Sequence, residues 1–327
     1  MIDLHLHFDG SLLPRTVIEL AREQQIPLPT EEPDELKLLL SAPVHCGSLN
    51  EYLEKFDLPL LVLQTKEAIR KGMYTLLSSL REQGMLYVEV RFAPQLHLQK
   101  GLTQEEVVKA AVMGMQEVTA GSFFKANLIL CCMRGADNRE ENLKTIRTAA
   151  MFLGRGVVAI DLAGAEALYP TPDFEDLFVY AKEHGVPFTI HAGEADGPES
   201  VEAAIRFGAK RIGHGVRAGE DAKLLALLRE RQIPLEMCPT SNAQTKAVAD
   251  LSEHPILDYL RAGLAVTVNT DNMTVSDTTI EREYLLLERT LGMTRQEYRQ
   301  LLFHAADAAF LTKDERARMK DVMYRII

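Results

Sequence analysis

The stretch Met1-Ile-Asp-Leu-His5-Leu-His7-Phe-Asp9-Gly10 opens the chain, and the fold can be interpreted outward from it. It is apolar and extended in character up to a glycine, so we expect a short buried strand that ends where the polar residues gather. Side chains two apart on a strand point the same way, so His5 and His7 would aim their imidazoles at one point. Alone, such a pair favours a metal ion only weakly, because nearby histidines are often just polar residues. The signal strengthens if other strands end in further ligands.

Length and composition are those of an ordinary globular chain with an acidic balance. The 327 residues suit one large α/β barrel or two smaller domains, and 46% hydrophobic and 25% charged residues are typical values. A formal net charge of −11 argues against nucleic acid as the main partner, because phosphate binding needs a basic face. No basic leader precedes an apolar run, and no window approaches the roughly 20 apolar residues of a membrane span. We therefore expect a soluble cytoplasmic protein, monomeric or weakly homo-oligomeric, with no membrane partner.

The four cysteines are Cys46, Cys131, Cys132 and Cys238, and none has C-x-x-C spacing. Cys131 and Cys132 lie inside an apolar run, where small cysteine side chains usually pack as hydrophobic residues. We expect free thiols under reducing conditions, and neither a zinc site nor a disulfide.

Short β-rich runs alternate with helical stretches along the chain. After the first strand, the predicted strands are 85–92, 126–133, 157–163, 187–191, 211–214, 233–238 and 264–269. The predicted helices between them are 104–120, 140–152, 174–184, 200–207, 219–231 and 255–262, and three more follow at 279–289, 295–310 and 313–325. Eight strands alternating with helices predict a (β/α)8 barrel, and no glycine-rich phosphate loop follows the first strand to favour a doubly wound sheet. We interpret residues 1–327 as one such domain.

The segment between the first two strands is predicted to be a helical insertion. It begins with a helix at 14–24 and continues through an acidic, proline-containing segment at 27–36. Residues 48–56 start with Ser48 and carry Glu51 at the third helical position, a capping-box pattern followed by apolar residues at helical spacing. The apolar run 58–63 either lines the mouth of a site or packs on the barrel.

Polar residues gather at the predicted C-terminal ends of strands, where barrel enzymes carry their chemistry. Strand five ends in His191-Ala-Gly-Glu194, strand six in His214, and strand eight in Asn269-Thr-Asp271-Asn272. The candidate ligands are three imidazoles and one carboxylate: His5, His7, His191 and Asp271. This set suits Zn2+ or a similar divalent ion, which would lower the pKa of a bound water toward about 7. The remaining histidines, His45, His97, His184, His254 and His304, are interpreted as structural.

Six motifs together resemble those of the adenosine deaminase family, within the metal-dependent amidohydrolase barrels. They run in order from residue 3 to residue 272: His5-Leu-His7-Phe-Asp9-Gly10, Asp161-Leu-Ala-Gly164, His191-Ala-Gly-Glu194, Gly213-His214-Gly215, Cys238-Pro-Thr-Ser-Asn242 and Asn269-Thr-Asp271. Residues 48–56 also resemble the family's helix at the mouth of the active site. For the run 58–63, the resemblance favours lining the mouth.

The resemblance implies hydrolytic removal of the 6-amino group of a purine nucleoside, with one zinc ion held by the four candidate ligands. Glu194 would give a proton to the purine N1, and Asp271 would also help to take the proton from water. His214 would orient the attacking oxygen and stabilise its charge without binding the metal. These three are the implied catalytic residues.

The implied substrate contacts are made by His7, Asp9, Gly164 and Asn272. Gly164 would offer its backbone N–H to the purine N3, and Asp9 would bind a ribose hydroxyl, most simply the 5′-hydroxyl. Asn272 departs from the pattern, because many family members carry an aspartate there that contacts N7. An asparagine can donate directly to an N7 acceptor, so we expect the contact to persist with reversed proton positions.

Three alternatives stay open at this point. Adenine, or an adenine nucleoside with a larger 5′ group such as aminodeoxyfutalosine, could replace adenosine and 2′-deoxyadenosine as substrate; Asp9-Gly10 and Thr240 to Thr245 resemble the nucleoside type. A catalytically silent binding protein would be expected to lose Glu194 or a ligand. A two-metal hydrolase would be expected to carry a bridging lysine on strand four, which has Asp161 and no lysine.

Overall fold

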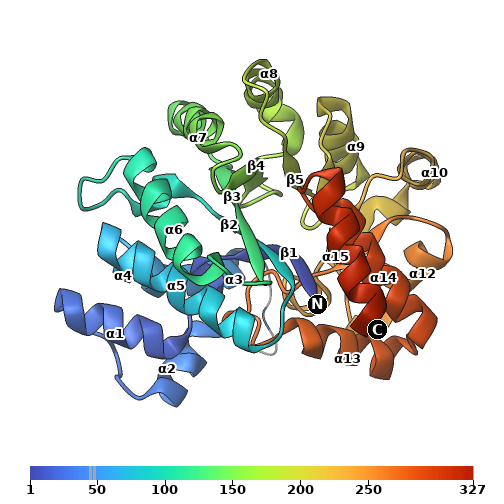
Figure 1. Ribbon diagram of the computed structural model, residues 1–327. Coiled ribbons are helices and arrows are strands. Elements are labelled where there is room, and N and C mark those ends of the chain that lie inside the picture. The colour runs from blue at the N-terminus through green and yellow to red at the C-terminus, as the bar shows by residue number, and fades with distance from the viewer. Residues whose placement is uncertain (44–45, 47–48, 327) are drawn as a thin grey trace.

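The computed structural model describes residues 1–43, 46 and 49–326 of the chain. Within them, eight parallel strands alternate with helices and form a (β/α)8 TIM barrel (Figure 1). The strands are β1 Ile2–His7, β2 Tyr87–Phe92, β3 Lys125–Met133, β4 Val157–Ala163, β5 Thr189–Ala192, β6 Arg211–His214, β7 Leu235–Met237 and β8 Val266–Val268. Every predicted strand is present, which confirms the predicted fold class, and β4 and β6 have the predicted bounds.

The barrel closes at two seams between its four-stranded halves, β1 to β4 and β5 to β8. At one seam Ile160 of β4 pairs with Phe188, directly before β5. At the other, β1 pairs with the segment after β8. The His7 N–H donates to the Asp271 carbonyl at 2.7 Å, and the Asp271 N–H donates to the His5 carbonyl at 2.8 Å. The second seam therefore places the ligand candidates of the first strand, His5 and His7, beside Asp271, which follows the last strand.

Helices surround the strands, and Figure 1 shows α6 to α10 arranged around the barrel with α14 and α15 near the N-terminus. Between and after strands β2 to β8 lie α6 Gln104–Thr119, α7 Arg139–Phe152, α8 Glu175–Glu183, α9 Pro198–Phe207, α10 Ala222–Arg231, α11 Pro239–Gln244, α12 Ile256–Arg261, α13 Ile280–Leu291, α14 Arg295–Ala308 and α15 Lys313–Ile326. Short 3-10 helices are η3 Pro94–His97, η4 Thr171–Phe174, η5 Val216–Glu220 and η6 Leu251–Glu253. Of these, α11 was not predicted, and it carries part of the candidate site.

The insertion after β1 contains η1 Asp9–Ser11, α1 Pro14–Gln24, α2 Pro33–Leu40, α3 Leu49–Leu53, η2 Glu54–Phe56 and α4 Asp57–Val62. Helix α1 has the predicted bounds. The acidic segment is not helical until Pro33, because proline is accommodated at a first helical position and not inside a helix. The predicted helix 48–56 is instead α3 followed by the 3-10 turn η2, and its predicted cap, Ser48, lies outside the described residues. Helix α5 Lys66–Glu82, capped by Thr65, completes the barrel layer before β2 and was not predicted as a separate element.

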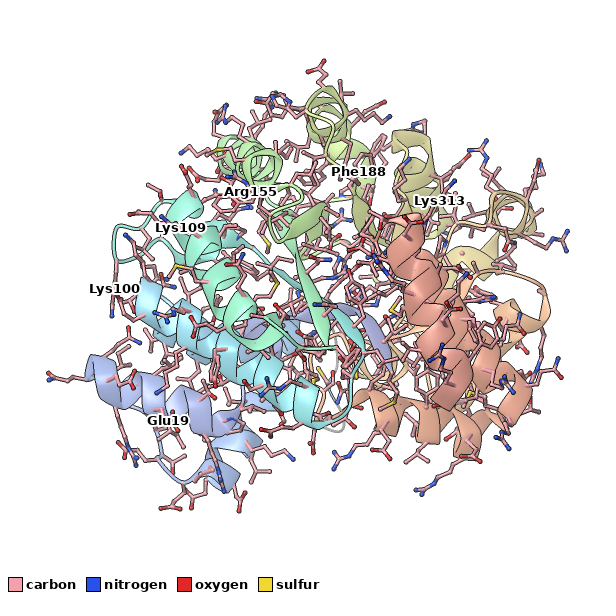
Figure 2. All side chains as sticks on the ribbon, in the orientation of Figure 1. Glu19, Lys100, Lys109, Arg155, Phe188 and Lys313 are labelled. Carbon is pink, nitrogen blue, oxygen red and sulfur yellow. The ribbon has the colours of Figure 1, made fainter. Side chains whose placement is uncertain are left out.

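The strands are buried on both faces, as expected where helices cover a parallel barrel. Figure 2 shows Glu19 and Lys100 at the edge of the molecule, and Phe188, at the β4–β5 seam, is buried. All four cysteines are buried, and Cys131, Cys132 and Cys238 are free thiols. Among the described helices, none has the length and apolar character needed to cross a membrane.

Candidate metal and active site

Three imidazole rings converge at the C-terminal end of the barrel, two from β1 and one from β5. The Nε2 atom of His191 lies 3.0 Å from Nε2 of His5 and 3.2 Å from Nε2 of His7. Oδ1 of Asp271 lies 3.4 Å from Nε2 of both His5 and His7. The structure therefore brings together the four residues predicted as ligands.

These separations fit a divalent cation. Four ligands at about 2.1 Å from a tetrahedral zinc ion lie about 3.4 Å from one another, and the measured separations are 3.0 to 3.4 Å. Neutral imidazole nitrogens that face one another this closely repel unless a cation or proton lies between them. Donor atoms of His5, His191, His214 and Asp271 also lie within 4.8 Å of one another, so His214 borders the same point. Nitrogen donors with one carboxylate suit zinc or a similar borderline metal.

Two buried carboxylates set the orientation of two of these rings. Nδ1 of His5 lies 2.9 Å from Oε2 of Glu236, and Nδ1 of His191 lies 2.8 Å from Oδ2 of Asp161. A carboxylate beside Nδ1 favours the proton on that nitrogen and leaves the Nε2 lone pair free for a metal. Burial lowers the pKa of His5 to about 4, which keeps its ring neutral. Burial also lowers the pKa of His191, but the nearby Asp161 outweighs it and the pKa lies above its ordinary value.

A buried ion-pair network inside the barrel supports these carboxylates. Arg91 donates to Asp161 and to Glu236, each at 2.8 Å, and Arg211 donates to Glu236 and Glu89. All five side chains are at most 1% exposed. Burial alone would disfavour such charges, and their mutual pairing compensates. With three carboxylates and two guanidiniums, the network carries an excess negative charge that a cation at the ligands would offset.

Asp271 occupies an unusual backbone position. Its φ of 60° lies in the left-handed region, which non-glycine residues seldom adopt. Its Oδ2 accepts a hydrogen bond from the Ser241 hydroxyl at 2.6 Å, while Oδ1 faces the histidines. Burial opposes ionisation of Asp271, but the adjacent His5 and His7 rings hold its pKa well below the ordinary value. Asp271 is therefore held as an anion pointing at the ligand cluster.

His214 also lies on left-handed backbone, with φ 62°. Its Nδ1 lies 3.0 Å from the Asn242 amide nitrogen, which can only donate, so the ring proton belongs on Nε2. That Nε2 lies 3.5 Å from Oε2 of Glu194. His214 thus presents an N–H toward the cavity. The amide oxygen of Asn242 is fixed by the Cys238 N–H at 3.1 Å and faces Nε2 of His254 at 3.2 Å.

The other histidines have structural contacts, as interpreted. In three of them Nδ1 faces a backbone carbonyl: His97 faces that of Leu63, His184 that of Tyr180 and His304 that of Val266. His254 supports Asn242 and lies outside the ligand cluster. His45 lies outside the described residues.

Glu194 is buried at the cavity wall beside His214. Burial raises the pKa of its carboxyl above the ordinary value, which favours the protonated form. Oε1 accepts from the Thr245 hydroxyl at 2.9 Å, so the side chain is oriented from the end of α11. A protonated carboxyl at this position can act as a general acid.

A cavity of about 210 Å³ connects these groups to the mouth of the barrel. Eight predicted site residues line it: His7, Asp9, Gly164, His191, Glu194, His214, Asp271 and Asn272. The insertion covers the opposite side with the mainly apolar residues Leu49, Tyr52, Leu53, Phe56, Asp57 and Leu60. The region expected to line the mouth therefore does so. No lysine or arginine of the described chain lines this cavity.

Two glycines shape the cavity wall. A Cβ on Gly10 would lie 1.9 Å from Oδ1 of Asn272, so only glycine leaves room for that amide. Oδ1 of Asn272 is buried and has no hydrogen-bond partner among the described residues. Gly164 has φ +107°, a conformation that side-chain-bearing residues avoid, and its backbone borders the cavity.

Several residues of this site were not predicted. Glu236 and Arg91 could have been noticed in the sequence, because charged residues inside otherwise apolar strands are unusual. Tyr52 of α3 is 1% exposed, and its hydroxyl lies 2.6 Å from the Ser276 hydroxyl. This hydrogen bond connects α3, at the mouth of the cavity, to the loop after β8. Thr245 and Glu166, which hold Glu194 from two sides, gave no pattern in the sequence.

Known proteins share the sequence pattern and the fold of this chain. The chain is 51% identical to an adenosine deaminase of Haemophilus ducreyi, over 99% of this chain and 96% of that protein. An adenine deaminase from Arthrobacter aurescens superposes with TM-score 0.89 at 26% identity, covering 98% of this chain and 96% of its own. An Arabidopsis protein, ADAL, in complex with GMP superposes with TM-score 0.86 at 25% identity, covering 99% and 96%. The adenosine deaminase family profile matches residues 1–326, so this chain belongs to the adenosine deaminase family.

Proposed function

We propose that this protein hydrolyses adenosine and 2′-deoxyadenosine to inosine and deoxyinosine, releasing ammonia. The single observation that carries the proposal is the cluster of His5, His7, His191 and Asp271 beside Glu194 in one buried cavity. Family membership and the name of the Haemophilus ducreyi relative support the same reaction.

We infer that the four clustered residues hold one zinc ion. Their separations support a cation held by all four side chains, and Glu236 and Asp161 orient two of the rings. When bound, a zinc ion would lower the pKa of a coordinated water and make a nucleophile available at neutral pH. Within this scheme His214 is an electrostatic group, because its Nε2–H faces Glu194 and the cavity.

Two carboxyl groups of the protein would transfer the protons of the reaction. Glu194, whose pKa is raised by burial, would give its proton to the purine N1 as water attacks C6. Asp271, held ionised, would accept a proton from the attacking water. His214 would donate a hydrogen bond to the attacking oxygen and stabilise the charge that develops there. Asp271 would then pass this proton to the leaving amine while the hydroxyl on C6 returns a proton to Glu194, which releases ammonia and leaves the 6-oxo purine.

The cavity residues support recognition of a nucleoside. Gly164 would donate its backbone N–H to N3, Asp9 would accept from a ribose hydroxyl, and Asn272 would contact N7 from the cavity wall. Burial raises the pKa of Asp9 to about 6, and it remains a hydrogen-bonding group in either protonation state. The cavity is lined by Asp9 and Asp57 and by no lysine or arginine of the described chain, so a 5′-phosphate would be disfavoured.

The alternative substrates are adenine and 5′-modified adenine nucleosides. Structural similarity to an adenine deaminase supports the first, but Asp9 suits a ribose hydroxyl, which adenine lacks. A silent binding protein is the weakest alternative, because the general acid and all candidate ligands are present and assembled.

The decisive test is ammonia release from adenosine, 2′-deoxyadenosine, adenine and AMP by the purified protein, before and after chelation. We expect chelator-sensitive turnover of the two nucleosides alone. Turnover of adenine alone would overturn the ribose assignment while retaining the chemistry. Turnover that survives complete zinc removal would contradict the metal assignment.

The Asn272 contact has its own test in 7-deazaadenosine, which lacks N7. Loss of a hydrogen bond to a neutral acceptor should lower kcat/KM by about tenfold. Equal kcat/KM for 7-deazaadenosine and adenosine would show that Asn272 does not make this bond.

A further inference from the structure

One buried carboxylate outside the cavity holds the loop that follows β5. Glu166 lies in the loop after β4, is 1% exposed and does not line the cavity. Its Oε1 accepts from the Gly193 N–H at 2.7 Å and the Ser200 hydroxyl at 2.5 Å. Its Oε2 accepts from the next three backbone N–H groups, at 3.0, 2.7 and 3.0 Å in chain order: Glu194, Ala195 and Asp196. Four consecutive N–H groups therefore converge on one side chain.

This arrangement is an anion-binding concavity filled by an internal carboxylate. The four N–H groups precede α9, which begins at Pro198, so helix hydrogen bonds do not use them. Burial raises the pKa of Glu166, but Arg134, the Ser200 hydroxyl and the loop N–H groups outweigh it, and the pKa lies below its ordinary value. Glu166 is thus a charged acceptor, and a neutral replacement would leave buried donors unpaired.

A second buried group ties the same region to the ligand strand. Arg134, which follows β3, donates to the His191 carbonyl at 2.6 Å and to the Thr171 hydroxyl at 2.9 Å. The Thr171 hydroxyl lies 2.6 Å from that of Ser200, which in turn donates to Glu166. The loops after β3, β4 and β5 are therefore joined through one polar network around Glu166.

We propose that Glu166 is a positioning residue for the proposed deamination, because it fixes the 193–196 loop so that the Glu194 carboxyl faces the cavity. The backbone of Glu194 is held by Glu166, and its side-chain tip is held by Thr245. Glu166 itself contacts neither the cavity nor a ligand candidate. The inference rests on the proposed function, in which Glu194 protonates the substrate.

The test uses the full-length, zinc-loaded protein with adenosine as substrate. Glu166→Ala removes a CH2 and a carboxylate, which are together the heavy atoms of acetate. Misplacement of a catalytic group by about 1 Å lowers rates about 100-fold, so we expect kcat to fall by about that factor with KM changed less than about threefold. Added sodium acetate should enter the vacated concavity and raise the kcat of Glu166→Ala about tenfold, to about one tenth of the wild-type value.

Four controls separate positioning from a general structural effect. Wild-type protein with acetate measures any inhibition, and sodium chloride matches the ionic strength. Propionate, one CH2 larger, should recover less activity than acetate. Glu297→Ala, in the partly buried capping box of α14 and outside the cavity, should keep full kcat and show no acetate response.

Unchanged kcat in Glu166→Ala would overturn the proposal, as would a loss that acetate fails to recover in a folded variant with full zinc content. If Glu166→Ala does not fold, Glu166→Gln keeps the side-chain shape but lacks one acceptor. Reduced kcat at normal zinc content and melting temperature would then support the proposal, and wild-type kcat would overturn it. Failure of wild-type protein to deaminate adenosine would instead contradict the proposed function.

Discussion

His214 and Asp271 show how single residues are fixed in this site by backbone conformation. Both have positive φ, at 62° and 60°, and such positions can each store about 1–3 kcal/mol of strain that the surrounding structure must offset. At Asp271 the offset includes two backbone hydrogen bonds to β1. The strained positions coincide with residues to which we assign chemical roles.

At Glu194 we predict that substitution by glutamine removes turnover without removing the metal. The amide keeps an acceptor for the Thr245 hydroxyl but cannot give a proton to N1, so kcat should fall by about 10²–10⁴-fold. Steady-state kinetics and zinc analysis of Glu194→Gln check this together. Surviving turnover at full zinc content would mean that another group is the general acid.

At Gly10 we predict that even a methyl group disturbs substrate binding. The Cβ of Gly10→Ala would lie 1.9 Å from Oδ1 of Asn272, so the amide must move. We expect kcat/KM for adenosine to fall about tenfold, with a smaller fall for 7-deazaadenosine, which makes no N7 contact. Equal losses for both substrates would indicate a general distortion of β1 instead.

The residues that could be predicted from the sequence share one property: they end strands or lie on them at a spacing that fixes direction. His5, His7 and His191 gave such a signal, and they do converge. Glu166 and Thr245 could not be found this way, because their roles depend on loops whose approach is set by tertiary packing. Gly10 was noted only as the end of a strand, and its need for close approach to Asn272 is visible only in space.

At the scale of secondary structure, the helix α13 is joined to α11 by another buried carboxylate. Glu283 accepts from the Thr240 N–H at 3.1 Å and from the Thr278 hydroxyl, and it is fully buried. Burial raises its pKa from 4.5 to about 7. The native state therefore binds this proton more tightly than the unfolded chain does.

This shift predicts a definite pH dependence of stability. Between pH 4.5 and about 7 the unfolded carboxyl ionises while the native one stays protonated, so its contribution to stability is present at low pH and lost as pH rises. The total change is at most about 3 kcal/mol. Urea unfolding of wild-type protein and Glu283→Gln across this range should show a steeper decline for the wild type. Parallel curves would contradict the assignment.

The elements with regular apolar spacing were predicted well, and irregular ones were not. α1, β4 and β6 have their predicted bounds. The predicted helix 48–56 has four apolar residues at helical spacing, but its described residues form α3 followed by the 3-10 turn η2. Leu49, Tyr52, Leu53 and Phe56 line the cavity. The short helix α11 packs against η6 and α13 and is bonded to Glu283 through the Thr240 N–H, and periodicity cannot reveal such contacts.

For the whole molecule, the ligand cluster joins the two halves of the barrel. His5 and His7 come from the β1–β4 half, and His191 and Asp271 come from β5 and the end of β8. A metal bound by all four should stabilise the native state by about 4 kcal/mol when free metal exceeds its Kd about 1,000-fold.

Chelation should therefore lower the melting temperature by several degrees as well as abolish turnover. Scanning calorimetry of the zinc-loaded and chelated protein measures this difference. His191→Ala should bind less zinc and melt with little response to the chelator. A chelator shift of equal size in His191→Ala would exclude that histidine as a ligand.

The seam between β1 and the segment at Asp271 also has a consequence during translation. During synthesis, one edge of the first strand can pair with β2 as soon as β2 is made. Its other edge pairs with Asp271 and stays unpaired until residue 271 has been synthesised. At about 5–20 residues per second that wait lasts on the order of 10 to 50 s, with an unpaired strand edge exposed. A nascent chain arrested before residue 271 would carry His5 and His7 without their carboxylate partner. Such a chain should remain protease-sensitive at its N-terminus however long it is stalled.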